Sequence, residues 1–140
     1  MTKCWMKKCL GQKLEPSDEI ALSYIKKLKP GADVEVDIRQ PRNIKFHRKW
    51  MALAKIVFDN QDVYDDFEAF RKELTMRAGF WEEHVHVTGK VSYVAKSIAF
   101  GSMDEIEFSE MYEKSIQAAL DHFIPGTDRA DLEEAIMDFA

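Results

Sequence analysis

The sequence predicts an α+β fold in which a small antiparallel sheet, made of N-terminal strands and a later hairpin, packs against three to five helices. Three observations predict it. Short segments alternate apolar and polar residues as strands do, longer segments repeat apolar residues at helical spacing, and Pro and Gly residues separate them. The chain has 140 residues and is 46% hydrophobic, which suffices for one core, so we expect a single domain over residues 1–140.

The first elements along the chain are a strand, a helix and a second strand. Residues 3–10 alternate as a short strand does. Pro16-Ser17-Asp18-Glu19 opens a helix that ends before Pro30-Gly31, because proline fits the first turn of a helix and not its interior. Residues 34–38 alternate valine or isoleucine with acidic residues, which predicts a half-buried strand.

The middle of the chain predicts two longer helices and a hairpin. Apolar residues recur at helical spacing over residues 42–58 and again over residues 62–77. Residues 81–88 and 90–95 flank Gly89 and are rich in residues that favour strands. We therefore expect a helix pair followed by an antiparallel hairpin.

The last third of the chain predicts two further helices. Ser102 and Glu105 have the spacing of a capping box, in which each side chain accepts from the other's backbone amide at a helix start. We expect that helix to run to about Phe123. Asp128 can then cap a short last helix that ends near Phe139.

Charge is strongly segregated along the chain, although the net charge is only −5. Residues 38–58 carry six basic residues and no acidic one, whereas residues 101–140 carry two basic and eleven acidic residues. An acidic protein can bind a polyanion through one basic face, because at short range the field follows local charge within a Debye length of about 10 Å. The basic segment is therefore a candidate binding surface.

The basic residues of this segment share one side of the expected helix. At about 100° per residue, five of them lie within an arc of roughly 140°, with Ala52 in its middle and apolar residues opposite. We interpret the arc, together with a preceding arginine, as a set of phosphate contacts. The predicted contacts are Arg39, Arg42, Lys45, Arg48, Lys49 and Lys55. The alternative is a solvated face that carboxylates of the same chain neutralise.

Binding of a single strand usually combines basic residues with aromatic side chains on which bases stack, and the expected hairpin carries such aromatic residues. Trp81 and Tyr93 could stack on bases, and such stacking is worth about 1–3 kcal/mol per base. The sequence thus predicts a protein that binds single-stranded nucleic acid.

No catalytic constellation stands out, so we expect a non-enzymatic protein without a cofactor. The sequence has no glycine-rich phosphate loop and no nucleophile elbow. His47 falls within the apolar side of its helix, which predicts a hydrogen-bonded and partly buried side chain rather than a base. Cys4 and Cys9 are expected to be reduced thiols.

One alternative is a metal-dependent nuclease. His84 and His86 are two residues apart on an expected strand, so both imidazoles would share a face and could share a metal. A third ligand would have to come from one of four residues. These are His47, His122, Glu82 and Glu83. Such a pair is more often a polar strand face, and we expect no metal.

The chain has no apolar run of the roughly 18 residues that a membrane-spanning helix requires, and its first residues lack a signal-peptide core. We therefore expect a cytoplasmic protein with no membrane partner.

Three stretches carry a resemblance to a family of small phage and prophage proteins known as domain-of-unknown-function family 1367. The stretches are residues 37–53 (DIRQPRNIKFHRKWMAL), 96–100 (KSIAF) and 103–108 (MDEIEF). The resemblance implies a bacteriophage or prophage protein that works in the host cell cytoplasm. Membership by itself names no activity.

More distantly, the order of elements resembles the phage lambda Orf (NinB) family of recombination mediators. Both have a strand, an arginine-rich turn into a helix and a later Met-x-x-x-Glu-Phe helix, and the matching residues here are Arg42, Arg48, Lys49, Ala52, Met103, Glu107 and Phe108. The resemblance implies a homodimer that binds single-stranded DNA and helps a recombinase load where single-strand-binding protein sits. Phe46-His47 departs from the Gln-Asn pair of that family.

A competing hypothesis assigns the function to the acidic C-terminal segment. The eleven acidic residues of residues 101–140 could present a DNA-like surface to a host protein. The chain would then be a protein-interaction module.

Overall fold

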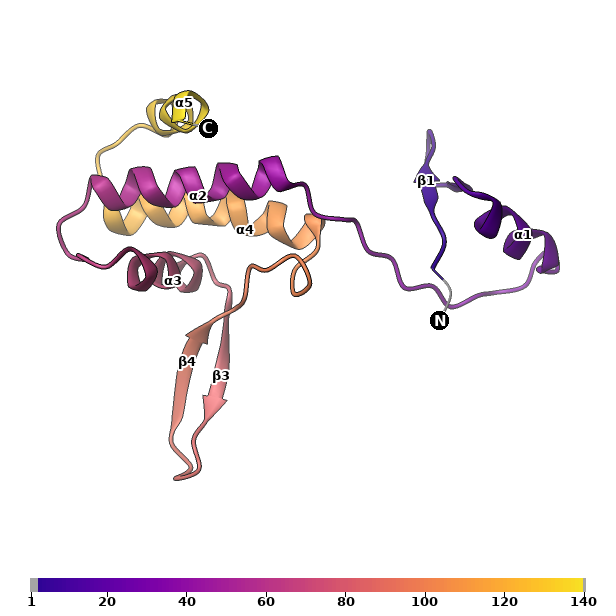
Figure 1. Ribbon diagram of the computed structural model, residues 1–140, viewed down its shortest axis with the longest axis horizontal. Coiled ribbons are helices and arrows are strands. Elements are labelled where there is room, and N and C mark those ends of the chain that lie inside the picture. The colour runs from indigo at the N-terminus through magenta and orange to yellow at the C-terminus, as the bar shows by residue number, and fades with distance from the viewer. Residues whose placement is uncertain (1–2, 140) are drawn as a thin grey trace. The chain divides into compact units, whose positions relative to one another are not determined.

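The computed structural model describes residues 3–139, so Met1, Thr2 and Ala140, the ends of the expected domain, lie outside the described residues. The chain divides into two compact units, Met1–Asp37 and Ile38–Ala140, each drawn in Figure 1. The single domain over residues 1–140 stays a prediction. The α+β class is confirmed, with five α-helices and two separate two-stranded antiparallel sheets among the described residues.

The first unit is a short hairpin followed by one helix. β1 (Met6–Lys8) pairs antiparallel with β2 (Leu14–Pro16), and the chain turns at Gly11. Asp18 begins α1 (Glu19–Lys27), where its carboxylate accepts from the Ala21 amide at 2.7 Å and from the Trp5 amide at 3.1 Å. The helix lies where the sequence predicts it, but it begins at Glu19 and Pro16 belongs to β2. The Asp18 carboxylate also ties the helix to Trp5, just before β1.

Two strand predictions in the N-terminal part differ from the structure. The strand expected over residues 3–10 is only three residues long, and β2 was not predicted. The strand expected over residues 34–38 is wrong, because that segment is irregular and Val34, Val36 and Ile38 are exposed. Alternation favours a strand only where a partner strand can take up its backbone hydrogen bonds, and none of the described strands pairs with this segment.

The second unit is a helical core that carries one hairpin. α2 (Ile44–Asp59) lies beside α4 (Glu105–Ala118), and α3 (Phe67–Arg77) and α5 (Arg129–Phe139) lie on either side of this pair, as Figure 1 shows. α4 continues as a π-helical turn, η1 (Ala119–Phe123). β3 (Trp81–Val85) and β4 (Val91–Ala95) form the hairpin, which projects away from the helices.

The core of this unit lies between the helices. Its largest fully buried side chains include Trp50, Leu53, Phe70, Leu74, Phe108, Met111, Ile116 and Ile136. Trp50 of α2 donates from Nε1 to the hydroxyl of Ser115 on α4 at 3.0 Å, so the one polar atom of the buried ring is satisfied. None of the described helices has the length and apolar character needed to cross a membrane.

Two helix starts in the second unit differ from the predictions. α3 begins at Phe67 rather than at residue 62, because Asp66 caps it and the Gln61 side chain folds the residues before it into a loop. α4 is capped by Asp104, whose carboxylate accepts from the Glu107 amide at 2.9 Å, so the capping box predicted from Ser102 is wrong. An aspartate caps as well as a serine does, and the Glu105 carboxylate is used elsewhere, by the Asn43 amide.

Candidate nucleic-acid interface

Arg42 lies just before α2 and is held by partners from its own chain. One guanidinium nitrogen donates to the carbonyls of Ile98 at 2.8 Å and Met103 at 3.2 Å. The other donates to Nδ1 of His47 at 2.8 Å, and the guanidinium carbon lies 3.6 Å from the centre of the Phe108 ring. Burial lowers the pKa of Arg42 from its ordinary value, against the opposing effect of Glu105. Arg42 therefore ties the segment before α4 to the start of α2.

His47 completes this cluster. It is half-buried and stacks on Phe108 with ring centres 5.8 Å apart. Because a guanidinium can only donate, Nδ1 of His47 must accept, and the ring proton of the neutral form lies on Nε2. Burial lowers the pKa of His47, and the nearby Arg42 and Arg71 lower it further. The prediction of a hydrogen-bonded, partly buried histidine is confirmed.

Lys45, Arg48 and Lys49 form a different group on the first turns of α2, and we call these three residues the cationic patch. Lys45 and Arg48 are exposed, and Lys49 is half-buried with its ammonium 5.1 Å from the centre of the Tyr112 ring. Burial raises the pKa of Tyr112 to about 12, so that phenol is neutral beside the lysine. Within residues 3–139, none of the three forms an ion pair with a carboxylate.

The other predicted phosphate contacts, Arg39 and Lys55, each have a polar partner among the described residues. Arg39 is exposed and donates from one guanidinium nitrogen to the Phe100 carbonyl at 2.8 Å. Lys55 is half-exposed and pairs with Asp59 at 3.3 Å, one turn along the same helix. Asp59 lies one residue beyond the segment that the sequence shows to be free of acids.

The predicted cationic arc is not open along its whole length, which corrects the expectation of a continuous exposed face. Ala52, in the middle of the arc, is only 3% exposed, and α2 also packs against α5. The structure therefore separates Lys55 from the cationic patch and leaves the first two turns of α2 as the open part.

The two predicted stacking residues lie on the projecting hairpin. Trp81 and Tyr93 are 44% and 53% exposed, and their rings meet edge to face with centres 5.0 Å apart. Both belong to one face of the hairpin. Tyr93 pairs with Glu83, and Glu83 is two residues from Trp81 and so shares its face. The structure thus brings these two residues together and leaves both accessible.

His84 and His86 also share a face of the hairpin, as predicted, with ring centres 4.7 Å apart. Nε2 of His86 is hydrogen-bonded to the Ser92 hydroxyl at 2.8 Å. Among the residues that the structure describes, no group of three or more His, Cys, Asp or Glu side chains is placed to hold a metal. Cys4 and Cys9, near the N-terminus, are also free thiols within residues 3–139.

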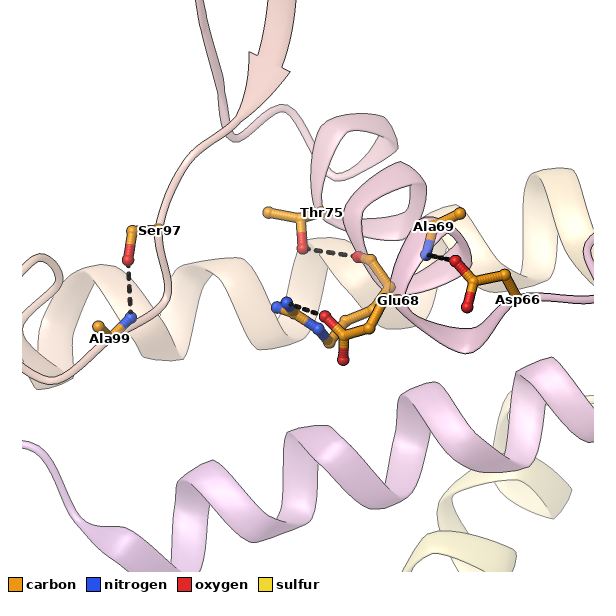
Figure 2. A network of polar contacts seen from close by, with 7 residues as sticks. Asp66, Glu68, Ala69, Thr75, Ser97 and Ala99 are labelled. Carbon is orange, nitrogen blue, oxygen red and sulfur yellow. Dashed lines mark hydrogen bonds and ion pairs between the residues drawn. The ribbon is translucent and has the colours of Figure 1, made fainter.

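A cavity of about 590 Å³, which no sequence pattern predicted, lies between α2, α3 and the segment after β4. Figure 2 shows Glu68 and Thr75 on α3 and Ser97 and Ala99 on the segment that leads from β4 toward α4. Charged lining residues of both signs include Glu68, Arg71, Lys72, Glu82 and Lys96. Arg71 donates to Glu68 at 2.7 Å, and this i, i+3 spacing was the only signal in the sequence.

The acidic C-terminal third is partly neutralised by one arginine of its own. Arg129 pairs with Glu113 of α4 and with Glu133 of α5, the latter at 2.9 Å. These pairs raise the pKa of Arg129. None of these carboxylates lies within ion-pair distance of the cationic patch.

A comparison with known protein families finds a match to part of the chain. A family model described as protein of unknown function (DUF1367) matches residues 60–124, and over that stretch the chain is similar to this family. The match includes the predicted motifs at residues 96–100 and 103–108 and leaves out the motif at residues 37–53. No curated protein and no solved structure matches the chain.

Proposed function

We propose that this chain binds single-stranded DNA, without catalysing a reaction on it, through the cationic patch and Arg39. The observation that carries the proposal is the state of Lys45 and Arg48, which are exposed, three residues apart on one helix face, and without a carboxylate partner among residues 3–139. Like charges at this spacing repel by a few tenths of a kcal/mol, and phosphates would relieve that repulsion.

The six predicted cations differ in how free they are to contact phosphate, because some already bind groups of their own chain. Arg42 has its donors directed at its own chain, so its contribution is to hold the start of α2 in place. Lys55 is a weaker candidate because Asp59 already pairs with it. Arg39 keeps its guanidinium exposed and can add a contact beside the cationic patch.

The exposed aromatic pair supports a single-stranded ligand over a duplex. Bases of a duplex are stacked on one another and cannot reach Trp81 and Tyr93, whereas unpaired bases can stack on exposed rings. The resemblance to the lambda Orf family supports a place for this binding in phage recombination, with single-strand-binding protein or a recombinase nearby.

Fluorescence anisotropy with labelled single-stranded and duplex oligonucleotides tests the proposal. The double change Lys45→Ala with Arg48→Ala should weaken single-strand binding on the order of 20-fold at ~0.1 M salt, since each phosphate contact contributes about 0.7 log units per decade of salt. A matched control, Lys26→Ala with Lys27→Ala, removes the same charge from exposed lysines of α1 and should have little effect. Equal losses for the two variants would mean that only net charge matters and would contradict the proposal.

The metal-dependent nuclease gains no support from the described residues, because no third ligand accompanies His84 and His86. The interaction module has one observation in its favour, which is that Glu110, Glu134 and Asp138 are exposed and unpaired within residues 3–139. Pull-down from host lysate with and without nuclease separates it from DNA binding. A protein that is captured equally in both cases would favour it.

A further inference from the structure

The cavity between α2, α3 and the segment after β4 has the size of a small-molecule site. Its volume of about 590 Å³ lies within the range of roughly 300–1,000 Å³ that ligand pockets occupy. The apolar part of its lining includes Met51, Ala95 and Ile98, and Ile98 belongs to the hydrophobic core. No residue of the cationic patch lines it. The cavity is therefore a second candidate site, apart from the patch.

Several hydrogen-bond donors of the lining have no partner within residues 3–139. Nδ1 of His47 accepts from Arg42, so the neutral ring carries its proton on Nε2, which makes no hydrogen bond there. Arg71 uses one guanidinium nitrogen to bind Glu68 and leaves the others without a partner. The hydroxyl of Ser97 accepts from the amide two residues on at 3.2 Å (Figure 2) and keeps its own proton available. The lining can thus donate several further hydrogen bonds.

The charges of the lining favour an anion, although the whole chain carries a net charge of −5. The cations are Arg71, Lys72 and Lys96, against the carboxylates of Glu68 and Glu82. Glu68 is already paired with Arg71. Lys72 has no ion pair among the described residues, and Lys96 lies 3.9 Å from Glu107, a long contact between exposed side chains. Two ammonium groups and most of a guanidinium therefore remain for a ligand.

These donors match a phosphate better than a carboxylate. A phosphate monoester carries a charge of about −1.5 to −2 at pH 7 and has three strong acceptor oxygens. A carboxylate carries one charge on two oxygens. Three cations and an imidazole N–H supply the number of donors that the phosphate can use, and the apolar part of the lining can contact the organic group attached to it.

We infer that this cavity binds a phosphate monoester. Arg71, Lys72 and Lys96 surround its oxygens, and Nε2 of His47 donates a further hydrogen bond. Glu82 is the carboxylate of the lining that has no ion pair among residues 3–139, so it weakens the binding of an anion. The inference does not rest on DNA binding by the cationic patch, because the two sites share no residue.

A titration of the full-length, isotope-labelled chain followed by NMR tests the ligand class. The probe is phenyl phosphate, and benzoate and phenol carry the same ring with a carboxylate and with no charge. Phenyl phosphate should shift the signals of the His47 ring and of the amides of residues 95–99 in a saturable manner. Benzoate should bind about 10-fold more weakly, and phenol should produce no saturable shift.

Two arginines of α3 provide a matched pair of variants. Arg71 and Arg77 each pair with one glutamate of the same helix, and only Arg71 lines the cavity. Arg71→Gln should weaken phenyl phosphate binding about 10-fold or more, because a charged hydrogen-bond donor is lost. Arg77→Gln removes the same charge and should leave the affinity nearly unchanged.

Two glutamates of β3 provide a second pair with the opposite sign. Glu82 and Glu83 are neighbours on the strand, so their side chains point to opposite faces, and only Glu82 lines the cavity. Glu82→Gln should strengthen phenyl phosphate binding about 2- to 3-fold, the effect of one exposed charge. Glu83→Gln should not.

Oligonucleotides distinguish the two sources of such a phosphate. In the variant Lys45→Ala with Arg48→Ala, a 5′-phosphate that strengthens single-strand binding, and does so only while Arg71 is present, identifies the end of a DNA strand as the ligand. Equal binding of 5′-phosphorylated and 5′-hydroxyl strands, with phenyl phosphate still bound, identifies a free small molecule.

Three results overturn the inference. The first is the absence of a saturable shift with phenyl phosphate up to high millimolar concentration. The second is benzoate binding as tightly as phenyl phosphate, which would make the cavity a carboxylate site. The third is an equal loss of affinity with Arg71→Gln and Arg77→Gln. If Arg71→Gln unfolds the chain, as far-UV circular dichroism would show, the comparison of Glu82→Gln with Glu83→Gln decides.

Discussion

Arg42 and Arg48 lie six residues apart in one basic segment, and the structure gives them opposite environments. Arg42 makes three hydrogen bonds to its own chain and packs on Phe108, whereas Arg48 is exposed and makes none among the described residues. Their charges are equal, so the difference lies in what surrounds them. A run of basic residues can thus combine a cation that holds the fold together with cations that are free to bind a ligand.

The largest expected effect concerns the stability of the fold. Arg42→Ala leaves the carbonyls of Ile98 and Met103 without their donor, so we expect the free energy of unfolding to fall by about 2–4 kcal/mol. Arg48→Ala should change it by no more than about 0.5 kcal/mol, as surface substitutions usually do. Urea denaturation of both variants measures this, and equal losses would remove the distinction between the two arginines.

The next effect concerns the salt dependence of DNA binding. Lys45→Ala with Arg48→Ala should reduce the slope of log affinity against log salt by about 1.4, which is two contacts at about 0.7 each on a single strand. Arg42→Lys, measured where it is fully folded, should keep the wild-type slope because its charge does not face the ligand. If Arg42→Lys alone reduced the slope, the role assigned to Arg42 would have to be abandoned.

A smaller effect depends on pH and tests the contact between Arg42 and His47. The folded-state pKa of His47 lies below its ordinary value of 6.5, so the unfolded chain binds a proton more readily than the folded chain does. The stabilisation from a neutral His47 is complete above pH 6.5 and is lost as the pH falls below it. The free energy of unfolding should thus decrease between pH 7.5 and pH 5.5 more steeply in the wild type than in His47→Gln.

Urea denaturation across that pH range gives the comparison. Carboxylates shift the stability of both proteins in the same way, so only the difference between the two curves reports on His47. Parallel curves would show that the histidine titrates alike in the folded and unfolded states.

The smallest effect concerns Lys55. Its pair with Asp59 is half-exposed and lies on one helix, so Lys55→Ala should cost only about 0.3–0.5 kcal/mol of stability. Single-strand affinity should change less than with Lys45→Ala, a change of the same residue type in the cationic patch. Anisotropy titrations of the two single variants make this comparison, and a larger loss for Lys55→Ala would extend the interface along the whole of α2.

The parts of the fold that could be predicted are those set by local sequence. The helix that follows Pro16-Ser17-Asp18-Glu19, the hairpin around Gly89 and the end of the last helix near Phe139 all follow from residues within one turn of each other. The position of His47 on its helix also predicted its partial burial, because helical periodicity alone decides which face points inward.

The remaining features depend on residues far apart in the sequence. The partners of Arg42 lie 56 and 61 residues away, so no local pattern separates it from Lys45. The burial of Ala52 likewise needs the packing of distant helices around α2. At residues 34–38 the alternation was real, but a strand also needs a partner, which the pattern cannot supply.

Lysine acetylation in the presence and absence of a single-stranded oligonucleotide shows whether DNA touches the cationic patch. Saturating DNA should slow modification of Lys45 and Lys49 at least several-fold and leave Lys26 and Lys27 of α1 unchanged, as read by mass spectrometry of peptides. Equal reactivity of Lys45 with and without bound DNA would contradict this contact.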